Sequence, residues 1–267
     1  MDKENRIAVL IDAENISNKY IKLIMDEVSD FGIATYKRLY GDYKSTSVKA
    51  WMKNIQDYAI TPVIQINYTQ GKNASDSALI IDAMDILYSE NVNVFCIVSS
   101  DSDFTKLAVR LRESGMSVIG MGEQKTPSSL VSACETFKFL DVLYKEEADE
   151  KIEKEFDIEE HKAEMETVPL EGEELNNYKA NNIPNKEDIE KEVISIINAR
   201  ASEDGWINLA EVGINLSKRV PGFDPRNYNY SKLGQMINSY ESFETKSVKN
   251  PHNNIIKVVY VKIRTRI

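Results

Sequence analysis

The run IAVLIDAEN at residues 7–15 places acidic and amide side chains directly after an unbroken apolar segment. The run VFCIVSSDSDF at residues 94–104 repeats this arrangement with a second apolar segment. Strands that are apolar at every position, rather than at alternate positions, are typical of parallel sheets covered by helices on both faces. Both runs therefore predict buried parallel strands with carboxylates at their carboxyl ends.

The alternation of apolar segments and helical patterns continues over residues 1–145. The pattern predicts strands at residues 7–11, 33–39, 63–68, 94–98 and 116–121, and helices at residues 19–28, 47–58, 75–88 and 104–112. Right-handed crossovers between parallel strands then give a doubly wound α/β domain. Ligands of such domains bind outside the carboxyl ends of the strands, where the strand order reverses. For a strand order 3-2-1-4-5, that point lies beside the first and fourth strands.

Four aspartates are expected at this edge of the sheet. Asp12 follows the first strand, and Asp76 lies in the first turn of the helix after the third strand. Asp101 and Asp103 follow the fourth strand. Like charges this close raise one another's pKa unless a cation neutralises them. Because the group contains no histidine or thiolate, it favours Mg²⁺ or Mn²⁺, which can activate water and stabilise charge on a phosphate.

Each of these residues also has a structural explanation. Asp103 is well placed to cap a helix, Asp76 to complement a helix dipole, and Asn15 to cap the first helix. Singly, these explanations are the commoner ones, but acids after several adjacent strands jointly favour a site. Glu14 is expected to be peripheral. Asp82 is six residues beyond Asp76, so it is expected on another face of the helix, either in a structural role or as a residue that supports the site residues.

Several other classes of protein are excluded by missing signatures. The sequence has no P-loop, no dinucleotide fingerprint after the first strand and no nucleophile elbow. Its two cysteines, Cys96 and Cys134, are too few for a disulfide framework or a cysteine-based zinc site. No apolar run is long enough to span a bilayer, and the first residues do not resemble a signal peptide. We therefore expect a cytoplasmic protein.

The formal net charge of −10 is concentrated in one segment. Residues 146–182 contain 4 Lys and Arg against 14 Asp and Glu, whereas residues 183–267 contain 13 against 10. An acidic segment that is poor in aromatic residues cannot bury enough apolar surface to fold alone. The sequence therefore predicts an α/β domain at 1–145, an acidic linker at 146–182 and a second domain at 183–267.

The second domain has the pattern of a winged helix. A helix capped by Asn185 is followed by helices at residues 209–220 and 233–240, and then by a β-hairpin at residues 243–249 and 255–263. Basic and aromatic side chains interleave here, as binding of single-stranded nucleic acid requires. Trp206 and Phe223 are expected in the core. The predicted RNA contacts are Arg226, Tyr228, Lys232, Lys246 and Lys249 in this domain, with Arg38 and Lys72 in the first.

Three motifs of the first domain resemble the NYN domain, in the LabA-like branch of the PIN-like nucleases. These motifs are LIDAENI at residues 10–16, KNASDSAL at 72–79 and VSSDSDF at 98–104, and the resemblance covers residues 5–145. It implies a metal-dependent ribonuclease that leaves 5′-phosphate ends. It also implies that Asp12, Asp76, Asp101 and Asp103 form the acidic site, with Asn15 as an orienting catalytic residue. Ser100 and Ser102 stand where many relatives have glycine.

The second domain is similar to the LOTUS (OST-HTH) winged helix, an RNA-binding module. The similarity rests on DGWINL at residues 204–209, PGFDPR at 221–226 and YNYSKL at 228–233. Asn229 stands where glycine is usual, and asparagine tolerates the left-handed conformation.

Together these observations predict a metal-dependent endoribonuclease that cleaves RNA phosphodiesters and carries a flexibly tethered RNA-binding module. The alternative is a non-catalytic RNA-binding adaptor with a vestigial acidic site, and cleavage of DNA also stays open. RNA is the expected partner and no membrane is expected; a homodimer is left open.

Overall fold

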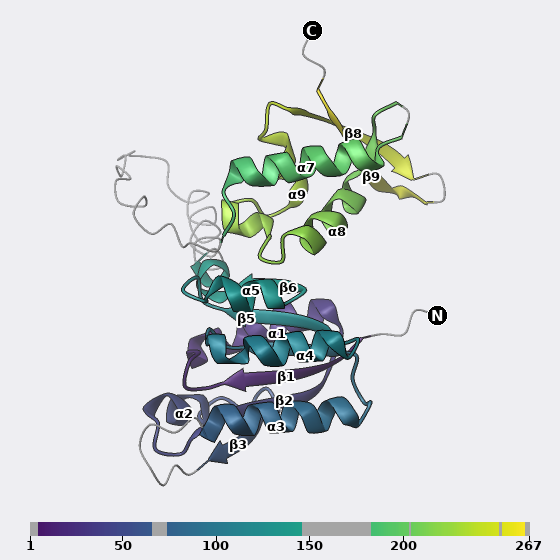
Figure 1. Ribbon diagram of the computed structural model, residues 1–267. Helices are drawn as coiled ribbons and strands as arrows, with labels where there is room; N and C mark the ends of the chain where they lie inside the picture. Colours follow the sequence, from purple (N-terminus) through teal and green to yellow (C-terminus); the bar gives the residue numbers. More distant parts are fainter. Residues whose placement is uncertain (1–4, 66–73, 146–182, 203, 251–252, 265–267) are drawn as a thin grey trace, which may run out of the picture.

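The structure is a computed structural model that describes residues 5–65, 74–145, 183–202, 204–250 and 253–264. These residues form two domains, each with its own apolar core (Figure 1). The predicted linker at 146–182 lies outside the described residues.

The first domain is built on a six-stranded parallel sheet. Its strands are β1 (Arg6–Asp12), β2 (Ile33–Asp42), β3 (Thr61–Gln65), β4 (Val94–Val98), β5 (Ser117–Gly122) and β6 (Thr136–Phe139). They lie in the order β3-β2-β1-β4-β5-β6, and every neighbouring pair is parallel. The doubly wound α/β fold and the order 3-2-1-4-5 are therefore confirmed. The sequence patterns did not predict β6, which forms one edge of the sheet.

Helices cover both faces of this sheet, which explains why β1 is apolar at every position. The helices are α1 (Ile21–Phe31), α2 (Thr46–Trp51), α3 (Ala74–Tyr88), α4 (Thr105–Glu113) and α5 (Ser128–Ala133). Ile7, Val9 and Ile11 pack in the core beside α1 and α2. Ala8 and Leu10 pack in the opposite core beside α3, α4 and α5. Successive side chains of one strand thus enter two separate cores.

Helix α2 is shorter than the expected helix at residues 47–58. It ends at Trp51, and residues 52–59 form turns. The indole N–H of Trp51 donates a hydrogen bond of 2.9 Å to the Ile16 carbonyl. This bond ties α2 to the loop that follows β1.

The second domain is a winged helix. Its elements are α7 (Lys186–Arg200), β7 (Ile207–Asn208), α8 (Leu209–Arg219), a 3₁₀ helix (Pro225–Tyr228), α9 (Leu233–Asn238), β8 (Phe243–Asn250) and β9 (Asn253–Ile263). The strands form a small antiparallel sheet in the order β7-β9-β8. Asn185 caps α7 by accepting the Asp188 N–H at 2.8 Å, as predicted. Asn229 is left-handed, with a φ of 63°.

The two domains touch directly at strand β6, which the sequence patterns did not anticipate. The Phe137 N–H donates a hydrogen bond of 2.6 Å to the Pro221 carbonyl. Ile183, just before α7, packs against the core of the first domain. Figure 1 shows the winged helix above this edge of the sheet. An edge strand exposes unpaired backbone groups, and here the second domain engages it.

Candidate metal centre and RNA surface

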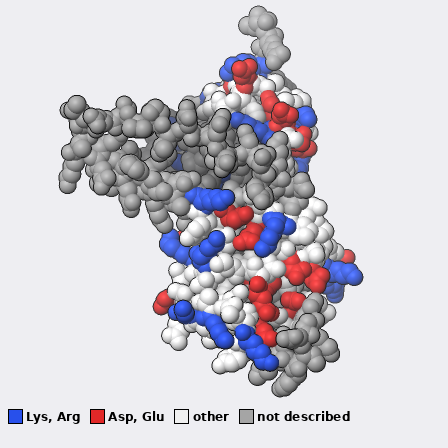
Figure 2. Space-filling view, turned by 90° about the vertical axis from the view of Figure 1, so that its left-hand side faces the viewer, with Lys and Arg blue, Asp and Glu red and all other residues white. Residues whose placement is uncertain are grey.

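Three of the four predicted aspartates come together at the carboxyl ends of the strands. Asp76, Asp101 and Asp103 each offer a carboxylate oxygen, and these oxygens lie within 4.8 Å of one another. Asp76 is in the first turn of α3, and the other two belong to the turn after β4. Figure 2 views this edge and shows Asp and Glu side chains gathered on the first domain. We call these three residues the acid cluster.

The turn after β4 is folded by its own side chains. Asp101 caps the 3₁₀ helix Ser102–Phe104, because its carboxylate accepts the Asp103 N–H at 2.9 Å. The Ser99 hydroxyl accepts the Asp101 N–H at 3.0 Å. The cap that the sequence assigned to Asp103 is therefore made by Asp101.

The acid cluster concentrates the negative charges of three carboxylates in a small volume. Burial raises the pKa of Asp76, and the charges of Asp101, Glu14 and Asp103 raise it further. Asp76 and Asp101 are partly buried, and Asp103 is exposed, so solvent reaches the cluster. A divalent cation would remove this repulsion and would find only oxygen ligands, which Mg²⁺ and Mn²⁺ prefer.

Asp12 lies beside the acid cluster but is not one of its three members. It is 4% exposed, and its carboxylate accepts the N–H groups of Glu14 and Asn15 at 3.0 and 3.2 Å. The Ser99 hydroxyl donates to its other oxygen at 2.9 Å. Burial raises the pKa of Asp12 to about 6, although these hydrogen bonds oppose the rise. The oxygens of Asp12 thus hold two loops together, and its assignment as a metal ligand stays a prediction.

Asn15 connects the loops around the site, and its expected catalytic role stays a prediction. Its side-chain oxygen accepts the Ser100 N–H at 3.1 Å. The Ser100 hydroxyl in turn accepts the Glu123 N–H at 2.8 Å, at the end of β5. A chain of hydrogen bonds thus connects the ends of β1, β4 and β5. In the sequence, Ser100 stands out only as a departure from glycine, and no local pattern indicates this connection.

Glu14 is not peripheral, so that expectation was wrong. Its carboxylate accepts a hydrogen bond of 2.5 Å from the Ser75 hydroxyl at the start of α3. Its charge also contributes to the raised pKa of Asp76. The sequence signal for this role was the position of Glu14, two residues after Asp12 at the end of the same strand.

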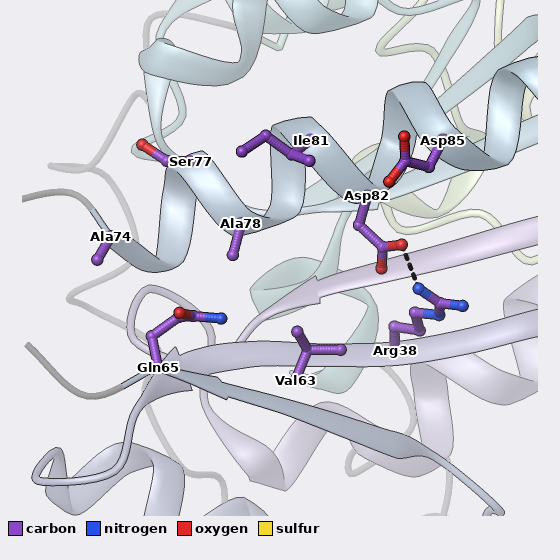
Figure 3. A pocket seen from close by; sticks show the side chains of 9 residues that line it. All are labelled: Arg38, Val63, Gln65, Ala74, Ser77, Ala78, Ile81, Asp82 and Asp85. Atoms are coloured by element: carbon purple, nitrogen blue, oxygen red, sulfur yellow. Dashed lines mark hydrogen bonds and ion pairs between the residues drawn. The ribbon is translucent and has the colours of Figure 1, made fainter.

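Arg38 faces a carboxylate of its own domain. Its guanidinium forms an ion pair with Asp82 on α3 (Figure 3). The Tyr40 hydroxyl donates to the same carboxylate. Arg38 and Asp82 lie at one end of a groove between β3 and α3, lined also by Val63 and Ala78. Asp82 therefore has the structural role that its position on α3 predicted. The charge of Arg38 is paired within the protein, and its contact with phosphate stays a prediction.

The exposed face of the winged-helix sheet carries cations stacked on aromatic rings. Val261 is buried, whereas Tyr260 and Lys262 on the same strand point to the opposite face. The ammonium of Lys246 lies 4.0 Å from the centre of the Trp206 ring, and that of Lys262 lies 5.9 Å away. We call Trp206, Lys246, Tyr260 and Lys262 the wing patch. Trp206, expected in the core, is only partly buried and supports this patch.

The family profiles agree with this arrangement of an acidic sheet edge followed by a basic winged helix. The NYN domain profile matches residues 6–141, which is half of the chain. The chain belongs to the NYN domain family. The OST-HTH/LOTUS domain profile matches residues 185–255, so both resemblances are confirmed in the expected order. A domain of the PIN-like nuclease superfamily followed by an RNA-binding domain supports a nuclease that binds RNA.

Three known proteins are similar to this NYN protein. An uncharacterized protein of Methanocaldococcus jannaschii is 26% identical over 131 residues, which are 45% of this chain and 49% of that protein. This chain therefore matches about half the length of that relative. A solved protein of unknown function from Vibrio parahaemolyticus has 16% identity and a TM-score of 0.45, covering 52% of this chain and 94% of its own. An uncharacterized protein of Nitrosomonas europaea has 23% identity and a TM-score of 0.26, and the match covers 37% of this chain and 95% of that protein.

Two predicted RNA contacts of the OST-HTH domain have other roles in the structure. The Arg226 guanidinium donates to Glu27 of the NYN domain and to Asp224. The Tyr228 hydroxyl donates to the Pro184 carbonyl at 2.8 Å, and its ring lies 6.0 Å from that of Phe223. Both side chains are thus held by protein partners, and their contacts with RNA stay predictions. Phe223 itself is buried, as expected.

The remaining predicted RNA contacts are four lysines, and the structure describes the side chains of two of them. Lys232 is exposed at the start of α9, and Lys246 is exposed in the wing patch. Lys72 and the side chain of Lys249 lie outside the described parts of the chain. In the described residues of this NYN protein, no helix is long and apolar enough to cross a bilayer.

Proposed function

We propose that this protein is a metal-dependent endoribonuclease that hydrolyses RNA phosphodiesters. The observation that carries the proposal is the acid cluster, in which oxygens of Asp76, Asp101 and Asp103 lie within 4.8 Å of one another. The cluster lies where doubly wound sheets bind ligands, in a domain of a nuclease superfamily. An OST-HTH domain on the same chain supports RNA as the substrate.

The donor set of the acid cluster fits Mg²⁺ or Mn²⁺. Three carboxylates supply hard oxygen ligands. Burial raises the pKa of Asp76 most, and the repulsion that raises it further is what a cation would relieve. We propose Asp76, Asp101 and Asp103 as the ligands. We propose Asp12 as the fourth acid of the site, since the charge of Asp76 reaches it and contributes to its raised pKa.

When bound, the metal supplies an activated water and stabilises negative charge on the phosphate. The protein residues position the metal ligands and the loops that carry them. Asp101 is held by Ser99, and the loop that carries it is held by Asn15 through the Ser100 N–H. Asp12 holds the loop after β1 by accepting hydrogen bonds from the N–H groups of Glu14 and Asn15. These bonds are formed within the protein, so the ligands do not have to rearrange when RNA arrives.

We propose the wing patch as the main RNA surface of the OST-HTH domain. Lys246 and Lys262 can neutralise phosphates, and Trp206 and Tyr260 offer ring faces on which unpaired bases stack. Lys232 is proposed as a further phosphate contact. A cytoplasmic location and a homodimer stay predictions.

The direct test incubates the purified full chain with labelled single-stranded RNA and DNA of the same sequence. Reactions contain Mg²⁺, Mn²⁺ or EDTA. An Asp76→Asn/Asp101→Asn protein, purified in parallel, controls for contaminating ribonuclease. We expect internal cleavage of RNA that needs metal and is lost in the variant. Binding of RNA without cleavage, together with no binding of Mn²⁺ by calorimetry, would instead support the adaptor with a vestigial site.

A further inference from the structure

Four charged residues form a closed network between the two domains. Glu27 of α1 and Lys138 of β6 belong to the NYN domain, and Asp224 and Arg226 to the OST-HTH domain. Lys138 lies 2.6 Å from the Asp224 carboxylate and 3.3 Å from that of Glu27. Arg226 lies 2.9 Å from Asp224 and 3.0 Å from the second oxygen of Glu27. Each acid thus meets both cations, and we call this set the interdomain network.

The acids of the network are almost completely withdrawn from water. Glu27 is 5% exposed and Asp224 is 6% exposed. Burial acts to raise the pKa of Asp224, but the hydrogen bonds and charges of Arg226 and Lys138 lower it to about 2. Buried ion pairs add little net stability, because removing the charges from water is costly. Leaving one of these buried charges without its partner is costly, so the four charges favour this placement of the two domains over placements that leave one unpaired.

Apolar and backbone contacts surround the network. Gly222 lies so close to β6 that an added Cβ would be 3.2 Å from the Phe139 ring. The Pro221 carbonyl accepts the Phe137 N–H, and Ile183 packs on the core of the NYN domain. Burial of apolar surface supplies the attraction between the domains, and the charges select the orientation.

The residues of the interdomain network are separate from those of the wing patch. Residues 221–226 of the OST-HTH domain are used for docking, whereas Trp206, Lys246 and Lys262 lie on its small sheet. A docked OST-HTH domain therefore keeps its wing patch at a constant distance from the acid cluster.

We propose that the interdomain network docks the OST-HTH domain on the β6 edge of the NYN domain and so sets the length of RNA that spans the two sites. Glu27, Lys138, Asp224 and Arg226 act as positioning residues, because they hold a domain rather than the substrate. The effect on cleavage rests on the proposed nuclease function, whereas docking itself does not.

The test uses exchange of charges in the full chain. Arg226→Glu leaves Lys138 facing three acids, and Glu27→Lys leaves Asp224 facing three cations. The double variant restores two charges of each sign, with both cations on the NYN domain. Arg219→Glu is the matched control, because Arg219 pairs with Glu192 inside the OST-HTH domain. Small-angle scattering measures the radius of gyration, and circular dichroism checks that each variant is folded.

We expect each single variant to have a larger radius of gyration than the wild type, and the double variant to return towards it. The cleavage rate is then measured on single-stranded RNAs of increasing length. In the wild type, kcat/KM should rise sharply at the length that spans the two sites. In Arg226→Glu, the rise should become gradual, while the rate on RNAs below that length stays unchanged.

Three outcomes are decisive. An unchanged radius of gyration in both single variants would overturn the interdomain network as the docking device. A sharp length threshold that persists in an undocked variant would overturn its role in RNA selection. If the wild type cuts no RNA, the proposed function fails, but the scattering comparison still decides whether the domains dock.

Discussion

The Ser99 hydroxyl donates a hydrogen bond of 2.9 Å to Asp12, which lies 87 residues earlier in the sequence. The same hydroxyl oxygen accepts the N–H of Asp101 at 3.0 Å. One buried serine therefore joins the strand end that carries Asp12 to the turn that carries two members of the acid cluster. This geometry makes Ser99 a direct test of how the site is assembled.

Replacing Ser99 with alanine should destabilise the NYN domain by about 1–3 kcal/mol, because two buried polar groups lose their partner. The loss of its donor should also raise the pKa of Asp12 further, since Ser99 acts to lower it. Chemical denaturation in EDTA measures the first effect. Ser102→Ala, at an exposed position in the same turn, is the control. Equal stability of the two variants would contradict this role of Ser99.

Asp12→Asn should flatten the dependence of stability on pH in metal-free protein. The pKa of Asp12 is about 6 in the folded protein, above its ordinary value of 3.8. The folded state therefore binds the Asp12 proton more tightly than the unfolded state does. This proton stabilises the folded state below about pH 4, and the stabilisation is lost as the pH rises through about 6. The difference in melting temperature between variant and wild type, followed from pH 4 to pH 7, isolates this group. The melting temperature of the variant should rise relative to that of the wild type as the pH increases. A difference that stays constant would contradict the raised pKa of Asp12.

Asp76→Asn and Asp101→Asn should each abolish metal-dependent cleavage. Loss of an outer partner of a metal ligand already weakens metal binding by about 10- to 100-fold, so loss of a ligand should weaken it by at least about 100-fold. Calorimetric titration with Mn²⁺ and cleavage assays measure the two effects. Asp85→Asn is the control, because Asp85 is exposed on α3 outside the acid cluster. Wild-type cleavage by both variants would show that the acid cluster is not the active site.

The two kinds of side chain in the wing patch should affect RNA binding differently. Lys246→Ala should weaken binding and reduce the slope of log affinity against log salt by about one, because a phosphate contact releases a counterion. Trp206→Ala should weaken binding by about 1–3 kcal/mol with little change in slope, because stacking carries no charge. Fluorescence anisotropy of a single-stranded RNA in EDTA, across a salt series, measures both. Lys191→Ala, at an exposed position of α7, should change neither the affinity nor the slope. No binding at low salt would contradict an RNA-binding role for this domain.

Much of the architecture followed from local patterns. A strand that is apolar at every position must bury both faces, so the runs at residues 7–11 and 94–98 already implied a parallel sheet between helices. The carboxyl ends of parallel strands share one edge, which is why acids far apart in sequence were expected together. Asn185 and Asn229 were also predictable, because a helix cap and a left-handed residue depend on short-range geometry.

The side-chain partners depended on contacts between distant segments. Glu14 was expected to be peripheral, but the start of α3 places Ser75 against its carboxylate. Arg38 and Arg226 are bases of the kind that bind phosphate, and each meets a carboxylate of its own chain. The same guanidinium suits an RNA phosphate and a buried aspartate or glutamate equally well. Apolar periodicity is a property of neighbouring residues and can be read along the chain, whereas the partner of a charge is selected by whichever opposite charge the fold brings within hydrogen-bonding distance.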